Sequence, residues 1–146
     1  MARRLPLLLI LLPALLHAAV RHFEVAAAFV PAKRPGGNGS VAVSFQPLDS
    51  DVRVNESPAP RLKLDLLQAV LVDRQPPAPS NAPDYDPSTA KYLDLAKPVL
   101  FPVGLAKGAP KGDQVVKGSV VFFYCSQREN WCRRGTAEIG IPVSVR

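Results

Sequence analysis

Cys125 and Cys132 are the residues of this 146-residue sequence best suited to chemistry. A cysteine pair either forms a disulfide that stabilises the fold or exchanges its thiol and disulfide forms with a partner. Arg128, Arg133 and Arg134 lie near the pair in sequence, and positive charge stabilises a thiolate. Both a structural disulfide and a redox-active pair therefore fit these residues.

Two aromatic residues, Tyr124 and Trp131, directly precede the two cysteines. They are placed to shield the sulfur atoms as site-lining residues. Tyr, Trp and Arg are also the usual anchors of protein interfaces, so Tyr124, Trp131, Arg128 and Arg133 fit a recognition surface equally well.

Other catalytic sets find little support in the sequence. His22 is the one histidine left if the first residues are removed, and Met1 is the only methionine. A zinc or copper site needs several His, Cys or Met ligands. Residues 104–112 lack the Gly-Lys-Ser/Thr ending of a phosphate-binding loop. We therefore expect neither a metal nor a cofactor.

The cysteines lie in a segment with strong strand patterns. Residues 120–124 are β-branched or aromatic, and residues 137–145 alternate between apolar and mostly polar positions. Pro142 has no N–H to donate, which favours the edge of a sheet for the second strand. We expect an antiparallel hairpin in which Cys125 ends the first strand, residues 126–135 form the loop and Cys132 lies inside that loop.

Further short strands are predicted upstream. Residues 61–73 fit either a helical stripe or two short strands, and the prolines on both sides favour the strands. A proline-rich stretch at residues 74–91 predicts a long irregular loop, the kind of loop that is often functional. The other predicted strands cover residues 23–30, 41–45, 52–54 and 92–103. Seven or eight short strands predict an all-β, immunoglobulin-like antiparallel β-sandwich with one disulfide-closed hairpin.

The N-terminus has the pattern of a secretory signal peptide. A basic start precedes an apolar run at residues 5–16, and the small residues Ala18 and Ala19 follow. The run is shorter than the roughly 20 residues of a membrane span, which disfavours an uncleaved anchor. We predict a signal peptide at residues 1–19, with a cut near Ala27 or Ala28 as the alternative, and a single domain at residues 20–146.

Export places the protein in the periplasm or outside the cell, where two cysteines usually pair. The formal net charge of +6 falls to +4 when Arg3 and Arg4 are removed, and the remaining basic residues are spread along the chain. This distribution argues against nucleic-acid binding. No other segment is long and apolar enough to span a membrane.

The cysteine segment resembles a known family. Phe123, Tyr124 and Cys125, a short polar interval, Cys132 and a closing Ile-Pro-Val strand are similar to the N-terminal domain of the bacterial thiol:disulfide interchange protein DsbD. The segment also resembles the C-terminal β-domain of NHL-repeat/thioredoxin-like proteins. Upstream, residues 51–55 and 58–66 resemble the same family.

The resemblance implies an immunoglobulin-like sandwich whose cysteine pair, under a cap loop, passes electrons from a thioredoxin-like domain to periplasmic isomerases. Carried over, the pair is Cys125 and Cys132, and the cap is the loop around Asp84 and Tyr85. The interval between the cysteines is slightly longer than in that family. The sequence has no thioredoxin part, so the resemblance implies a separate thioredoxin-like or isomerase-like redox partner. The alternative is a disulfide-stapled sandwich of the cell envelope that binds a partner without chemistry.

Overall fold

The computed structural model describes residues 18–33, 37–78 and 86–146, which form nine strands and no helix. Alternating apolar residues and frequent prolines favour strands over helices throughout this part of the chain. The strands are β1 (Ala18–Val20), β2 (Phe23–Pro31), β3 (Asn38–Pro47), β4 (Val52–Val54), β5 (Arg61–Leu64), β6 (Leu71–Asp73), β7 (Val99–Leu105), β8 (Gly112–Ser126) and β9 (Trp131–Val145).

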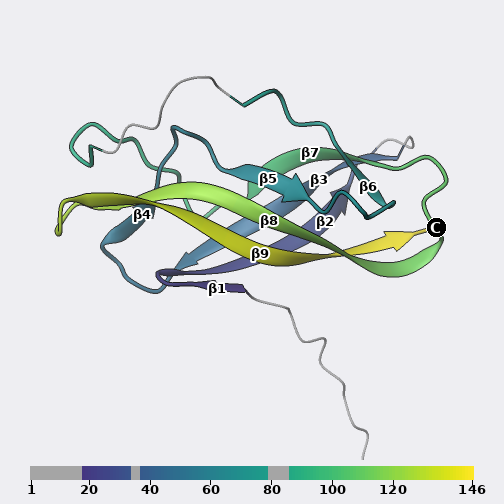
Figure 1. The fold of residues 1–146 in the computed structure, drawn as a ribbon, viewed down its shortest axis with the longest axis horizontal. Coiled ribbons are helices and arrows are strands. Elements are labelled where there is room, and N and C mark those ends of the chain that lie inside the picture. The colour runs from purple at the N-terminus through teal and green to yellow at the C-terminus, as the bar shows by residue number, and fades with distance from the viewer. Residues whose placement is uncertain (1–17, 34–36, 79–85) are drawn as a thin grey trace, which may run out of the picture.

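The strands form two antiparallel sheets that pack face to face (Figure 1). One sheet has the order β1-β2-β3-β7-β6. In the other sheet, the long strand β8 is paired with β9 along one edge, while β4 and β5 pair with successive parts of its other edge. The all-β antiparallel sandwich with a disulfide-closed hairpin is therefore confirmed.

The core lies between the two sheets and contains a cluster of aromatic rings. Phe23 of β2 packs edge-on against Phe122 and Tyr124 of β8, with ring centroids 5.6 and 5.4 Å apart. Phe45 of β3 completes the cluster at 4.9 Å from Phe122. Gly135 of β9 pairs with Phe122, and a Cβ there would lie 2.9 Å from the Phe122 Cζ atom. The absence of a side chain at Gly135 therefore leaves room for the aromatic rings.

Several strand predictions are confirmed. The ambiguous residues 61–73 form two short strands, β5 and β6, as the flanking prolines favoured. In β9, Ala137, Ile139 and Ile141 face the core as the alternation predicts. Pro142 does lie in an edge strand, because β9 pairs only with β8 among the described strands.

One strand boundary was predicted wrongly, and one strand was missed. The strand expected at residues 92–103 is present only as β7, and Tyr92 instead makes an isolated bridge with Asn55. The prolines at 98 and 102 do not prevent β7, because residue 98 precedes the strand and Pro102 lies within it as the register partner of Ser40. A further strand, β1, was not expected and pairs with β2 at residues 23–25.

The predicted signal peptide largely lies outside the described residues, since residues 1–17 are not among them. Within the described part of the chain, no helix is long and apolar enough to cross a bilayer.

Candidate functional site

The cysteine pair lies at the end of the β8–β9 hairpin. Cys125 and Cys132 are register partners and form a disulfide, with their Cα atoms 4.0 Å apart. The expectation that Cys132 lies in a loop is therefore wrong: it belongs to β9, and the loop contains only residues 127–130. Asn130 has a φ of 55°, the left-handed conformation that asparagine tolerates and that closes short hairpin loops.

The sequence did not predict this extension of β9, because residues 131–135 do not alternate between polar and apolar. The β9 residues at this end are exposed or only partly buried, so backbone pairing and the disulfide, instead of side-chain burial, continue the ladder. The disulfide thus joins two paired strands directly across from each other.

The two cysteines differ in their exposure to solvent. Successive residues of β8 point to opposite faces of the sheet. Because Tyr124 faces the core, Cys125 faces away from it. Cys125 is nevertheless 0% exposed, whereas Cys132 is half-buried. A molecule that reacts with this disulfide from solvent therefore reaches Cys132 first.

Asn55 lies directly beside the buried sulfur. Its side chain is 0% exposed, and its Oδ1 atom lies 3.2 Å from Cys125 Sγ. The backbone N–H of Asn55 donates to the Phe123 carbonyl at 2.8 Å, which continues the pairing of β4 with β8. Its Nδ2 atom has no hydrogen-bond partner among the described residues. Asn55 is thus a buried polar side chain in contact with the disulfide.

The segment around Tyr92 borders the same end of the sheet. The N–H of Leu93 donates to the Val54 carbonyl at 2.9 Å, and Tyr92 forms a bridge with Asn55. The Tyr92 hydroxyl donates to the Pro87 carbonyl at 3.2 Å. Burial raises the pKa of Tyr92, and the Arg53 guanidinium, 5.9 Å from the ring centre, opposes that shift. These contacts fix residues 86–93 beside the hairpin.

A shallow cleft separates that segment from the hairpin loop. It has a volume of about 140 Å³ and is lined by Pro87, Ser88, Gln127 and Asn130. The cap predicted around Asp84 and Tyr85 lies outside the described residues. Its described continuation, residues 86–93, is the segment that borders the cysteine hairpin.

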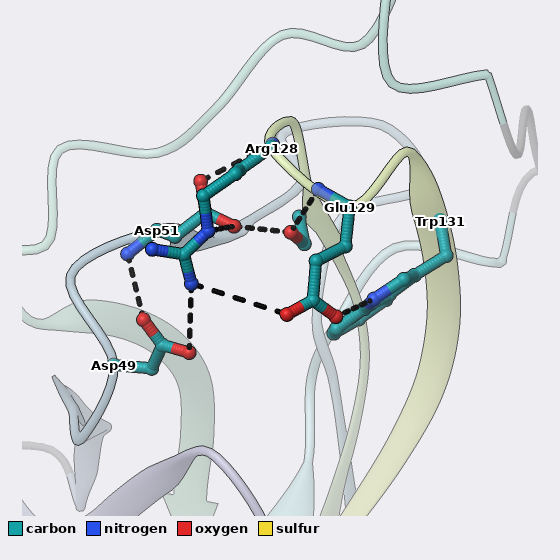
Figure 2. A network of polar contacts seen from close by, with 6 residues as sticks. Asp49, Asp51, Arg128, Glu129 and Trp131 are labelled. Carbon is teal, nitrogen blue, oxygen red and sulfur yellow. Dashed lines mark hydrogen bonds and ion pairs between the residues drawn. The ribbon is translucent and has the colours of Figure 1, made fainter.

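A polar network anchors the hairpin loop to the chain just before β4 (Figure 2). Asp51 accepts hydrogen bonds from the Ser126 hydroxyl and from the backbone N–H of Arg128, the latter at 3.2 Å. The Ser126 hydrogen bond is the main cause that lowers the pKa of Asp51, and the Arg128 N–H and guanidinium act in the same direction. At neutral pH Asp51 is therefore ionised and holds the loop.

Arg128 points into this network of carboxylates (Figure 2). Its guanidinium lies 3.8 Å from Asp51, 4.0 Å from Asp49 and 3.9 Å from Glu129. Glu129 also accepts a hydrogen bond from the Trp131 indole N–H at 2.8 Å. Because three carboxylates balance its charge, Arg128 holds the loop in place and is a poor source of positive charge for a thiolate.

The other predicted site-lining residues lie on the opposite face of the hairpin from the disulfide. Tyr124 is a core residue, 4% exposed, and its ring meets that of Trp131 at 5.8 Å. The guanidinium of Arg133 lies 4.4 Å from the centre of the Trp131 ring, a cation–π contact. His22 packs on the same indole at 5.4 Å. These aromatics order the hairpin end without touching the face that carries the sulfur atoms.

Sequence reasoning missed Asn55 as a site residue. It follows the alternating strand Val52–Val54, where the next outward position is normally solvent-exposed, so nothing local marked it as buried. The one available signal in the sequence was a polar residue at the end of a predicted strand. Asn55 is buried by segments that lie 37 or more residues away in the chain.

Comparison with protein-family models, curated proteins and solved structures found no match. Among the described residues, no group of three or more His, Cys, Asp or Glu side chains is arranged to hold a metal ion.

Proposed function

We propose that this chain is an exported thiol–disulfide interchange domain whose Cys125–Cys132 pair relays electrons between redox proteins. The observation that carries the proposal is the unequal burial of the two cysteines. A disulfide between a fully buried and a partly exposed cysteine directs an incoming thiolate to the sulfur of the exposed residue, here Cys132 Sγ. This order of attack is what a relay needs, since the partner must bond to one defined cysteine.

The exchange begins when a partner's thiolate attacks Cys132 Sγ. The Cys125–Cys132 bond breaks, its electron pair stays on Cys125, and a mixed disulfide joins the partner to Cys132. The second thiol of the partner, as its thiolate, then attacks the partner's own sulfur in that mixed disulfide and releases Cys132. Two electrons and two protons have then moved from the partner's dithiol to the cysteine pair.

The surroundings support such a cycle. The two cysteines belong to strands of 15 residues each that pair along their whole length, so the hairpin has many interactions besides the disulfide. The resemblance to the N-terminal domain of the DsbD family points to a thioredoxin-like donor or an isomerase-like acceptor. The predicted signal peptide would place the domain in the periplasm or outside the cell.

The alternative is a binding module in which the disulfide is only structural. The ion-pair network around Arg128 favours it, because a loop held by Asp49, Asp51 and Glu129 is preorganised and presents fixed side chains to a partner. Such a module needs no reducible disulfide.

Equilibration with glutathione separates the two functions. A relay disulfide should have a reduction potential between about −120 and −270 mV, and a structural disulfide lies below about −300 mV. A value under −300 mV would leave the binding module as the function of this chain.

Two matched variants test the order of attack. Cys125→Ser keeps the half-buried Cys132 and should form a mixed disulfide with oxidised glutathione, visible by intact mass. Cys132→Ser keeps the buried Cys125 and should react at least about tenfold more slowly, because a buried thiol is shielded from attack. Equal rates in the two folded variants would contradict the proposed entry through Cys132.

A further inference from the structure

We propose that Asn55 favours reduction of the disulfide by hydrogen-bonding the Cys125 sulfur in its reduced forms. This inference rests on the proposed function for its biological meaning, but the chemistry concerns the disulfide itself. The inference rests on one observation: the buried Asn55 amide contacts Cys125 Sγ, and the disulfide gives this amide no hydrogen bond.

The oxidised pair is a poor neighbour for this amide. Asn55 Oδ1 lies 3.2 Å from Cys125 Sγ, but a disulfide sulfur has no proton to donate. Turning the amide over would place Nδ2 against the sulfur, which is only a weak acceptor, and would leave Oδ1 without a donor instead. In the observed orientation neither Oδ1 nor Nδ2 has a hydrogen bond to the disulfide or to another described residue, and in the turned orientation Oδ1 has none. Unmatched groups of a fully buried amide destabilise the state that contains them.

Reduction supplies the missing partner. When a dithiol attacks Cys132 Sγ, the electron pair of the broken bond stays on Cys125 as a thiolate. The Asn55 Nδ2 group can donate to that anion after a rotation of its amide, which sacrifices no hydrogen bond because Nδ2 has no partner among the described residues. The thiolate then takes a proton from water. When the amide turns back to the orientation seen in the structure, the resulting S–H donates to Oδ1.

The second half of the reaction does not involve Asn55. The other sulfur of the dithiol closes its own disulfide and releases Cys132 as a thiolate, which is protonated by water. The dithiol loses two electrons and two protons, and the cysteine pair gains them. Asn55 therefore acts on both the leaving sulfur and the final thiol of Cys125.

The test compares Asn55→Leu with the wild-type protein in dithiothreitol redox buffers at pH 7. Leu is similar in shape but forms no hydrogen bond, so the ratio of reduced to oxidised protein should fall about tenfold, the effect of one net hydrogen bond. A tenfold change corresponds to about 30 mV for this two-electron couple. The rate of reduction by dithiothreitol should fall as well, because the leaving thiolate loses its donor.

Val54→Ala is the matched control. Val54 is the preceding residue, equally buried, and lies on the core side of β4. Its truncation should lower the stability of the domain without changing the ratio of reduced to oxidised protein. Asn55→Ala, which opens a cavity instead of filling it, is the second variant and should shift the ratio in the same direction as Asn55→Leu.

The outcomes distinguish this inference from the proposed function. Ratios for both Asn55 variants within about twofold of wild type would overturn the role of Asn55 and leave the relay intact. A shifted ratio in a protein that exchanges with no thioredoxin-like partner would support Asn55 and refute the relay.

If dithiothreitol reduces the disulfide only on unfolding, the same quantity follows from urea unfolding of the oxidised and reduced proteins. Asn55→Leu should then raise the unfolding constant about tenfold more in the reduced protein than in the oxidised one. Equal effects in the two redox states would overturn the inference.

Discussion

Reduction of the Cys125–Cys132 disulfide should leave the sandwich folded and lower its free energy of unfolding by about 2.5 kcal/mol. The bond joins residues with a sequence separation of 7, so it closes a very short loop in the unfolded chain. Chain-entropy arithmetic for a loop of about eight residues gives roughly 8 cal/mol/K, which is about 2.5 kcal/mol at 25 °C. The paired strands β8 and β9 keep their backbone hydrogen bonds after reduction.

The assay is urea unfolding at pH 7 with and without dithiothreitol, followed by far-UV circular dichroism. For a domain of this size the expected loss corresponds to a fall in Tm of about 10 °C. Cys132→Ser in oxidising buffer is the control, because the half-buried position accepts a hydroxyl and the variant should match the stability of the reduced wild-type protein.

Two results would refute this reasoning. A reduced protein that is unfolded at 25 °C, or that loses more than about 5 kcal/mol, would mean that the disulfide holds the native sheet together. A relay cycle would then be contradicted, since it requires a folded reduced state. A loss below about 1 kcal/mol would show that the unfolded chain already keeps the hairpin closed.

Three further predictions concern other parts of the chain. The hydrogen bonds of Asp51 lower its pKa in the folded state, so its contribution to stability is present above the ordinary pKa of about 3.9 and is lost as the pH falls through the lower, folded value. The urea midpoint of Asp51→Asn should therefore fall less between pH 7 and pH 3 than that of the wild-type protein. Equal falls in the two proteins would contradict this role of Asp51. Gly135→Ala should lower the free energy of unfolding by about 1–3 kcal/mol, measured by urea unfolding, because the new methyl group would meet the Phe122 ring at 2.9 Å, and an unchanged midpoint would show that the ring moves aside freely. Intact mass of the exported protein should show an N-terminus within residues 18–22, because a cut at Ala27 or Ala28 would remove the buried core residue Phe23; a mature chain starting later would count against the packing of β2.

Local patterns in the sequence predicted most of the strands. The alternation in residues 137–145 identified the buried face of β9, because a period of two matches the geometry of a strand with one dry face. The prolines on both sides of residues 61–73 disfavoured a helix, because proline lacks a backbone N–H and clashes with the preceding helical turn. The pairing of Cys125 with Cys132 was also accessible, since two cysteines close in sequence have few other partners.

The candidate site was only half accessible in this way. Tyr124, Trp131 and Arg133 are adjacent to the cysteines in sequence, but neighbouring strand residues point to opposite faces, so adjacency does not place them at the sulfur atoms. Arg128, one of the three arginines expected to stabilise a thiolate, is instead bound by carboxylates that include Asp51, far away in the sequence.

What the sequence by itself determined is the local chemistry: a cysteine pair in a hairpin, strands with one apolar face, and an all-β class. Only the tertiary structure decided which sulfur is buried, that Asn55 lies against it and that residues 86–93 border the same end of the sheet. The physical reason is that burial and contact at this site arise between segments distant in the chain. No local periodicity encodes the approach of β4 to the end of β8, and that approach brings a buried amide to the sulfur of the fully buried cysteine.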